Sequence, residues 1–347
     1  MSMKSYRSFS PNLDYFTGKS VLITGATGSF GSAMLDTLLR DTKATRIIAY
    51  SRDELKQHDL QLRLRDFPGF KERVRFFIGD VRDQFRLEMA LHGVDYVIHA
   101  AALKQITTAE YNPFECIHTN IIGAENVIRA SLNSGVTKVI ALSTDKAANP
   151  INLYGASKLA SDKLFIAASN LGRPRGCIFS VVRYGNVIGS RGSVIPVFHK
   201  LIADGADHLP LTDRNMTRFW ITLRQGVAFV LSNIETMVGG ENFIPKIPSM
   251  KILDLVAALA PDLPHKIVGV RPGEKLHETL VTRDDAINTV ELADRYVILP
   301  PPSEHWPPEL FAGIRESGEL CPADFQYTSD SNTEWLGPED LSYWLAH

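Results

Sequence analysis

An acid, an amine and a phenol–lysine pair lie within one short segment of the sequence. Asp145 and Lys146 are adjacent, and Tyr154 and Lys158 follow with a Tyr-x-x-x-Lys spacing. Residues four apart share one face of a helix, so the Lys158 ammonium can lie beside the Tyr154 phenol, lower its pKa and make it a base toward a hydroxyl group. Alone, this spacing more often belongs to an ordinary surface helix. Beside a dinucleotide-binding site, the segment predicts a redox site with an elimination site built into it.

A strand, a glycine turn and a helix precede this segment in the order that a dinucleotide site needs. Val21–Thr24 runs directly into a turn with glycines at Gly25, Gly28 and Gly31, and an apolar-periodic helix pattern follows. Gly25 and Gly28 permit a tight turn and the close approach of a pyrophosphate, while Gly31 lets the helix pack against the strand. The helix N-terminus would face the anion. The next strand, 46–50, comes at the spacing of a βαβ unit, which strengthens the prediction.

The residues after this second strand bear on the choice between NAD and NADP. Ser51, Arg52 and Asp53 follow it directly. A hydroxyl and a guanidinium stand where an NAD site would place a carboxylate on the ribose, and this favours binding of a 2′-phosphate. We therefore predict NADP as the cofactor. Asp53 leaves NAD as an alternative, because it lies close enough to the strand end to bind a ribose hydroxyl.

Composition and charge argue against several classes of protein. The chain has 347 residues, 44% hydrophobic and 22% charged, which is ordinary for a globular protein with a sizeable core. Its net charge of −2 gives no reason to expect nucleic acid or a charged membrane surface as a partner. Cys116, Cys177 and Cys321 are scattered and odd in number, which predicts neither a disulfide framework nor a metal site. No segment reads as a signal peptide or a membrane helix, so we expect a cytoplasmic protein.

Strand-like runs alternate with helical patterns through the first half of the chain. The later runs are 75–78, 96–100, 138–143 and 178–183. This alternation predicts an α/β fold with a Rossmann-type, doubly wound parallel sheet covered by helices on both faces. Ligands bind at the carboxyl ends of such strands, so the small and polar residues there should line one crevice. Asp80 is the candidate for the adenine amino group. The alanines at 100–102 either admit the cofactor to the backbone or only pack tightly.

The pattern changes near Asn186, where glycines and prolines begin to interrupt it. We predict an NADP-binding Rossmann domain at 17–185, to which 221–247 returns. Residues 186–220 and 248–340 should form a smaller, mostly α C-terminal lobe that binds the substrate. Three arginines of this lobe could clamp a diphosphate through bidentate contacts: Arg191, Arg218 and Arg271.

Motifs spread over almost the whole chain resemble one protein family. The chain resembles extended short-chain dehydrogenases/reductases, and within them the inverting UDP-N-acetylglucosamine 4,6-dehydratases. As a set, these motifs are far more specific than any one of them. The matching segments are Thr24–Gly31, Tyr50–Lys56, Phe76–Asp83, His99–Lys104, Ala141–Pro150, Val182–Val187, Met216–Thr222 and Arg271–Glu278.

Two positions favour the inverting branch of these dehydratases. Retaining sugar-nucleotide dehydratases carry an Asp-Glu pair where this chain has Asp145 and Lys146, and related dehydratases of capsule and N-glycan pathways commonly carry Met where Tyr154 stands. The resemblance implies conversion of UDP-N-acetylglucosamine (UDP-GlcNAc) to UDP-2-acetamido-2,6-dideoxy-β-L-arabino-hex-4-ulose, the first step of pseudaminic acid-type biosynthesis. It also implies a lyase with tightly bound NADP that is regenerated in each turnover.

The side chains suggest a division of roles in this reaction. Tyr154 would deprotonate the C4 hydroxyl, and Lys146 would take the C5 proton if cationic or apolar surroundings depress its pKa. Asp145 would protonate the departing C6 hydroxyl if it is kept protonated. Tyr154, Lys104 or a water molecule would return a proton to C5 from the opposite face.

The motifs and the resemblance together give a full set of candidate site residues. The catalytic candidates are Asp145, Lys146, Tyr154 and Lys158. The candidates for NADP binding are Gly25, Thr27, Gly28, Ser29, Phe30, Gly31, Ser51, Arg52, Asp53, Glu54, Leu55, Lys56, Asp80, Val81, Ala100, Asn120, Val187, Ile188, Gly189, Ser190 and Arg191. The candidates for UDP-sugar binding are Lys104, Asn186, Val194, Thr212, Arg271 and Glu274.

Two other functions compete with the dehydratase. A C4 epimerase of UDP-hexoses would share the cofactor site, Tyr154 and Lys158, but would not need the acid–base pair Asp145 and Lys146. A non-catalytic relative could bind NADP and a partner protein, although the four intact catalytic candidates speak against it. For the dehydratase, the resemblance implies a homo-oligomer whose product passes to an aminotransferase.

Overall fold

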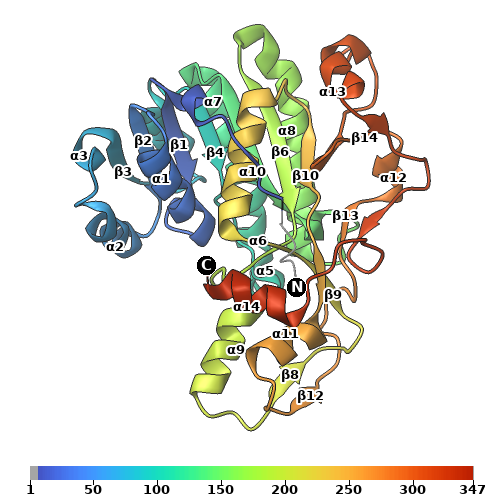
Figure 1. Cartoon of the computed structure of the whole chain (residues 1–347). Coiled ribbons are helices and arrows are strands. Elements are labelled where there is room, and N and C mark those ends of the chain that lie inside the picture. Colours follow the sequence, from blue (N-terminus) through green and yellow to red (C-terminus); the bar gives the residue numbers. More distant parts are fainter. Residues whose placement is uncertain (1–6, 347) are drawn as a thin grey trace.

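A large twisted sheet forms the centre of the molecule (Figure 1). The computed structural model describes residues 7–346. The sheet has ten strands in the order β16-β14-β15-β10-β6-β5-β4-β1-β2-β3. Seven consecutive strands of this sheet run parallel to one another: β1 (Ser20–Thr24), β2 (Arg46–Ser51), β3 (Val74–Ile78), β4 (Tyr96–His99), β5 (Lys138–Thr144), β6 (Ile178–Tyr184) and β10 (Asn242–Pro245).

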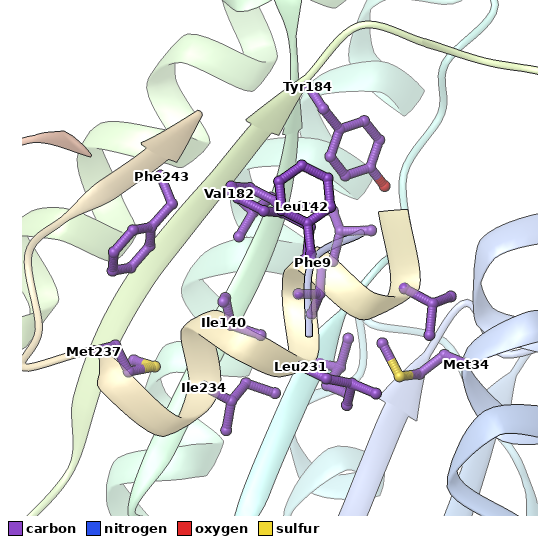
Figure 2. Close-up of a cluster of buried hydrophobic side chains, with 14 of the residues drawn as sticks. Phe9, Met34, Ile140, Leu142, Val182, Tyr184, Leu231, Ile234, Met237 and Phe243 are labelled. Atoms are coloured by element: carbon purple, nitrogen blue, oxygen red, sulfur yellow. The ribbon is translucent and has the colours of Figure 1, made fainter. Parts of the chain in front are cut away.

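Helices cover both faces of this sheet, as the sequence predicts for a doubly wound fold. One face carries α1 (Ser29–Asp41) and α10 (Leu223–Thr236), and the other carries α4 (Gln84–Leu91), α7 (Gly123–Ser134) and α8 (Leu153–Gly172). Successive strand residues point to opposite faces, so Val21 and Ile23 of β1 pack in one apolar cluster and Leu22 in the other. Figure 2 shows Leu231 and Ile234 of α10, and Met237 directly after it, near strand residues such as Ile140 and Val182.

The remaining elements of the first 175 residues lie before β1, between strands or next to a longer helix. They are η1 (Leu13–Phe16), α2 (Glu54–Leu64), α3 (Phe70–Arg73), α5 (Ile106–Tyr111), α6 (Pro113–Ile117), η2 (His118–Ile122), η3 (Asp145–Ala147) and η4 (Arg173–Arg175).

A smaller lobe lies below the C-terminal ends of the parallel strands (Figure 1). Its apolar core includes Trp220, Met250 and Leu341, all buried. Three helices and several short strands build it: β7 (Asn186–Val187), α9 (Val194–Ala203), β8 (Leu209–Leu211), β9 (Thr217–Ile221), β11 (Ser249–Lys251), α11 (Ile252–Leu259), β12 (His265–Ile267) and α14 (Pro338–Ala346). The lobe also contains strands beside its helices: β7, β9 and β11 form a three-stranded sheet and β8 pairs with β12.

Part of the C-terminal segment joins the central sheet rather than the lobe. β15 (Arg295–Ile298) pairs antiparallel with β10, and β14 (Thr289–Glu291) and β16 (Glu319–Leu320) extend the same edge. These three strands lie within 248–340, the segment that we predict for the substrate lobe, and each of them is short. β15 pairs with β10 and so covers what would be an exposed sheet edge. The division of the whole chain into a cofactor domain and a substrate lobe otherwise stays a prediction.

The other C-terminal elements are short. β13 (Thr279–Val281) pairs with β17 (Tyr327–Thr328), and α12 (Arg283–Ala286), η5 (Pro308–Phe311) and α13 (Ala312–Glu316) complete the segment. Within residues 7–346, none of the helices has the length and apolar character needed to cross a bilayer.

Candidate active site

The glycine turn between β1 and α1 is packed too closely for side chains. Gly25 has φ +66°, and a Cβ there would lie 2.9 Å from backbone atoms of Ala100 and Ala101 at the end of β4. A Cβ on Gly31 would overlap the Gly25 carbonyl oxygen. The turn therefore brings the N-terminus of α1 to the C-terminal ends of two neighbouring strands. This is the cradle that a pyrophosphate requires, so the residues present fit a dinucleotide.

A groove of about 250 Å³ runs along these strand ends. It brings together ten of the 21 residues that the sequence predicts for NADP. Ala101 and Ala102, for which the sequence left close approach of the cofactor as one alternative, also line it. Tyr50, Gly79 and Thr119 line it too and were not among the candidates. The predicted residues that line the groove are Gly25, Thr27, Gly28, Ser51, Arg52, Asp53, Lys56, Asp80, Val81 and Ala100.

Other predicted cofactor residues lie beside the groove without lining it. Ser29 and Phe30 begin α1, and Glu54 and Leu55 form the first turn of α2. Asn120 is buried, and its amide holds the backbone of Leu103 through two hydrogen bonds of 2.8 and 2.9 Å and donates to Ser157 Oγ at 2.9 Å. A direct cofactor contact by these residues stays a prediction.

The residues after β2 divide their tasks. Asp53 is the N-cap of α2, accepting a hydrogen bond from the Lys56 amide at 3.0 Å, and its other oxygen lies 2.6 Å from Lys56 Nζ. Hydrogen bonding to Lys56 keeps the pKa of Asp53 below its usual value. Arg52 lies 3.5 Å from Asp80 and stays half-exposed on the groove. Because Asp53 already caps a helix and pairs with Lys56, Arg52 is the freer of the two to meet a ligand.

The loop from Val187 to Arg191 crosses from the lobe to the glycine turn. The Arg191 amide donates to Ser29 Oγ at 3.1 Å, and its guanidinium donates to the Thr27 carbonyl oxygen. Gly189 bends the loop with φ +68° and Ile188 is buried. Arg191 lines a second cavity of about 170 Å³, together with Thr27, Ser32, Lys56, Asp59, Leu60 and Arg63. The lobe therefore reaches the cofactor groove through this loop, which includes Ser190.

Asp145 and Lys146 form a close ion pair directly after β5. Lys146 Nζ lies 2.9 Å from Asp145 Oδ1 and 3.4 Å from Asn186 Oδ1. The Thr144 hydroxyl also donates to Asp145 Oδ1, at 2.8 Å. Asp145 is fully buried, whereas 22% of the Lys146 side chain is exposed. An acid and an amine thus meet at the C-terminal end of a central strand, where parallel sheets bind their ligands.

Close packing sets α8 against this pair. Asn152 caps α8 by accepting from the Gly155 amide at 2.7 Å. A Cβ on Gly155 would overlap the Lys146 carbonyl oxygen and would lie 3.1 Å from Pro150 Cβ. Only glycine lets the first turn of α8 approach so closely, and Tyr154 belongs to that turn. Sequence analysis overlooked Gly155, although it lies inside the Tyr-x-x-x-Lys motif.

The expected effect of Lys158 on Tyr154 is wrong. Burial raises the pKa of the Tyr154 phenol to about 12, and the ammonium that opposes this shift is Lys146, helped by a hydrogen bond with Thr144. Burial lowers the pKa of Lys158, and Asp162 works against that shift. Asp162 in turn accepts from Ser143 Oγ at 2.7 Å. Lys158 is thus paired electrostatically with Asp162, while Lys146 acts on the phenol.

The condition stated for Lys146 as a base, a depressed pKa, is not met. Burial alone would lower it, but the carboxylates of Asp145 and Glu278 outweigh burial and raise the pKa of Lys146 above its usual value. Glu278 Oε1 lies 3.4 Å from Lys146 Nζ and 3.7 Å from Arg218 Nε. Arg218, predicted to clamp a diphosphate, is buried and donates to the carbonyl oxygens of Thr217, Lys275 and Leu276.

The structure brings some predicted substrate residues to this centre. Asn186 contacts Lys146, and Lys104 is close enough for Lys146 and Arg191 to lower its pKa, together with burial as the largest cause. Gly273 accepts a hydrogen bond from Asn152 at 2.8 Å, which places the loop of Arg271 and Glu274 against the start of α8. The side chains of Arg271 and Glu274 pair at 3.8 Å.

Two substrate candidates lie farther along the lobe. Val194 begins α9, and Thr212 directly follows β8. Whether these two side chains meet a substrate stays a prediction.

Comparison with known proteins adds to this geometry. The chain is 55% identical over 334 residues, 96% of its length and 98% of the relative's, to an inverting UDP-N-acetylglucosamine 4,6-dehydratase of Campylobacter jejuni. It is also 44% identical to a UDP-glucose 4-epimerase of Rickettsia prowazekii, covering 82% of this chain and 83% of that one.

Solved structures share the fold. Pen from Bacillus thuringiensis superposes with a TM-score of 0.84 at 34% identity, covering 96% of this chain and 98% of that one. DesIV of Streptomyces venezuelae, a dTDP-glucose 4,6-dehydratase with NAD bound, superposes with a TM-score of 0.63 at 25% identity, covering 74% and 86%.

A family profile described as polysaccharide biosynthesis protein matches residues 21–300. This match spans the glycine turn, the groove and the Asp145–Lys146 pair. With its Rossmann-like sheet and its similarity to inverting UDP-N-acetylglucosamine 4,6-dehydratases, the chain belongs to the polysaccharide biosynthesis protein family within the extended short-chain dehydrogenases/reductases.

Proposed function

We propose that this protein is an NADP-dependent UDP-GlcNAc 4,6-dehydratase that inverts C5. The substrate would be UDP-N-acetylglucosamine and the product UDP-2-acetamido-2,6-dideoxy-β-L-arabino-hex-4-ulose. The observation that carries the proposal is the Asp145–Lys146 pair, 2.9 Å apart and beside Tyr154. An enzyme that only oxidises and reduces C4 needs the phenol alone. An acid and an amine next to it are what elimination of water across C5 and C6 requires.

The groove at the strand ends would hold the cofactor. The glycine turn would receive the pyrophosphate, and Arg52 with Lys56 would favour a 2′-phosphate over a ribose hydroxyl. When bound, the nicotinamide supplies the oxidation at C4 and the reduction at C6 within one turnover. Because the same cofactor is reduced and reoxidised, the site has no need to release it.

Tyr154 would accept the proton of the C4 hydroxyl. Burial raises the pKa of its phenol to about 12, and the Lys146 ammonium keeps this rise smaller than burial alone would make it. The C4 ketone that results acidifies the neighbouring C5 proton. Tyr154 and Lys146 are therefore coupled: the cation that stabilises the phenolate is also the group needed for the next step.

Asp145 and Lys146 would carry out the elimination together. The amine must be neutral to take the C5 proton, and the nearest acceptor for its own proton is Asp145 Oδ1 at 2.9 Å. Transfer across this hydrogen bond produces a neutral amine and a carboxylic acid in one step. The amine then removes the C5 proton, and the acid protonates the C6 hydroxyl as it leaves. Asp145 Oδ2 is buried and accepts no hydrogen bond from residues 7–346, so it can meet a substrate hydroxyl.

Inversion requires that C5 is reprotonated from the face opposite Lys146. Tyr154 holds a proton after the first step, and Lys104 lies near enough to Lys146 to feel its charge. We propose one of these two groups, or a water molecule, as the donor. The product carries a C4 ketone, which an aminotransferase would be suited to consume in pseudaminic acid-type biosynthesis. We also expect a homo-oligomer.

Incubation with UDP-GlcNAc in D₂O, without added cofactor, tests the proposal. We expect loss of water, one deuterium at C5, inverted configuration at C5 and a new C6 methyl group. Proton NMR and mass spectrometry measure these changes. Lys146→Ala should abolish water loss while nucleotide binding is retained. A product that keeps its water and changes configuration at C4 would make the protein an epimerase, as the Rickettsia relative is named. Absence of any sugar change with NADP bound would support the non-catalytic reading.

A further inference from the structure

Glu278 is a buried carboxylate that the proposed mechanism does not yet use. It ends the segment Arg271–Glu278 and directly precedes β13, which lies against the Asp145–Ala147 turn. Only 2% of the residue is exposed. Its backbone is fixed by Ser329, whose hydroxyl accepts from the Glu278 amide at 2.9 Å and whose amide donates to the Glu278 carbonyl oxygen at 2.8 Å. A charged side chain held so firmly inside the protein needs a cationic partner.

Lys146 is that partner. Its ammonium lies 2.9 Å from Asp145 Oδ1 and 3.4 Å from Glu278 Oε1, so it stands between two carboxylates. Glu278 Oε1 is shared with Arg218 at 3.7 Å. Glu278 Oε2 is buried and has no hydrogen-bond partner within residues 7–346, as is true of Asp145 Oδ2. Each carboxylate thus uses one oxygen on Lys146 and keeps a second oxygen that a substrate hydroxyl could satisfy.

We propose that Glu278 is a positioning residue for Lys146, holding its ammonium through a second contact besides that of Asp145 at the C-terminal end of β5. This inference rests on the proposed function, because positioning matters only if Lys146 takes a proton from the substrate. Asp145 is adjacent to Lys146 in sequence and restrains the amine through one contact. Glu278, which belongs to a remote segment fixed by Ser329, adds a second restraint. A base must lie within hydrogen-bond reach of the proton it abstracts, so both restraints serve the same step.

The same arrangement controls how readily Lys146 loses its proton. The ionisable groups that interact electrostatically with Lys146 come from several parts of the chain: Asp145, Glu278, Arg218, Lys104, Lys275 and Tyr154. The two carboxylates raise the pKa of Lys146, whereas burial and Arg218 lower it. Without the charge of Glu278, only the Asp145 carboxylate remains to oppose the effect of burial on the pKa of Lys146. The pKa of Lys146 should then fall, by about 1 to 3 units for an opposite charge at this range.

Pulse acetylation with acetic anhydride tests this without any substrate. The full-length protein is labelled at a series of pH values, and the modified fraction of Lys146 is measured by mass spectrometry, with the exposed Lys163 as internal reference. The reagent can reach Lys146 because 22% of its side chain is exposed. In Glu278→Gln the onset of labelling should move to lower pH than in the wild type. An unchanged onset would overturn the proposal.

A matched control separates this effect from the cost of altering a buried carboxylate. Glu241 is also buried and accepts from Ser180 Oγ at 2.6 Å and from the Gly239 amide at 2.8 Å, away from Lys146. Glu241→Gln should lower stability and leave the labelling onset of Lys146 unchanged. If Glu278→Gln does not fold, Glu278→Asp is labelled instead, because its shorter side chain keeps the carboxylate but moves it away from the Lys146 ammonium. A labelling onset of Lys146 at lower pH than in the wild type supports the proposal, and an unchanged onset overturns it.

Measuring the reaction itself separates the role of Glu278 from the proposed dehydratase function. Glu278→Gln should incorporate deuterium at C5 about 10²-fold more slowly than the wild type, and the limb of its pH profile that requires neutral Lys146 should move to lower pH. If wild-type protein makes the dehydrated sugar and the labelling onset of Lys146 in Glu278→Gln does not move, the dehydratase function is supported and the role of Glu278 is refuted. If the labelling onset of Lys146 moves but the wild type makes no dehydrated sugar, the contact between Glu278 and Lys146 is supported and the dehydratase function is refuted.

Discussion

Replacing Gly155 with alanine should damage catalysis far more than folding. The new Cβ would overlap the Lys146 carbonyl oxygen and would lie 3.1 Å from both the Lys146 carbonyl carbon and Pro150 Cβ. Two of these three atoms are backbone, so no flexible side chain can move aside. Relief requires the first turn of α8 to shift away from Lys146 by on the order of 1 Å, and a misplacement of that size at a catalytic centre costs about 10²-fold in rate.

The cost in stability should be smaller. Overpacking a well-packed site by one methyl group typically costs about 1–3 kcal/mol, part of which the helix recovers because alanine favours a helix over glycine. Thermal or denaturant unfolding measures this change, and deuterium incorporation at C5 of UDP-GlcNAc measures the rate. The two readings together show whether the variant is folded and misaligned or simply unfolded.

Gly313→Ala is the matched control. Gly313 lies in α13, and a Cβ there would meet no heavy atom within 4 Å. This variant should keep wild-type activity and be neutral or stabilised by about 0.4–1 kcal/mol. Wild-type turnover in Gly155→Ala would refute the reasoning, because it would show that the contact between α8 and Lys146 does not set the position of Tyr154.

Two further predictions concern cofactor choice and charge. Arg52→Ala should weaken NADP binding about 10- to 100-fold by removing a charge-assisted contact and leave NAD binding unchanged; calorimetric titration of both cofactors checks this, with the exposed Arg65→Ala as control, and equal losses for both would contradict it. Because its folded-state pKa lies above the ordinary lysine value, Lys146 contributes stability that is complete below about pH 10.5 and lost as pH rises through the folded pKa. The free energy of unfolding should therefore fall more steeply above about pH 10.5 in the wild type than in Lys146→Ala, and parallel curves in urea would count against the pairing.

Local patterns in the sequence were enough to predict most of the fold. The six strands predicted in the first half of the chain correspond to β1 to β6, and the glycine turn lies between β1 and α1 as predicted. Such elements are defined by neighbours in the sequence: an apolar run forms a buried strand, and a glycine turn after it begins a helix. The Asp145–Lys146 pair and the Tyr-x-x-x-Lys motif were visible for the same reason.

Tertiary structure alone decided the chemical state of these side chains. A depressed pKa was the condition for Lys146 to act as a base. Burial lowers its pKa, but Asp145 beside it and Glu278, far along the chain and 3.4 Å from its ammonium, together raise it. Tyr154 feels Lys146 more than Lys158, because Gly155 lets the start of α8 approach the turn after β5. The antiparallel strands β14 to β16 escaped notice because they are short and need β10 as a partner. Sequence spacing thus determines which groups are present and in which element. Their pKa values and distances depend on burial and on charges from remote segments, which only the folded chain brings together.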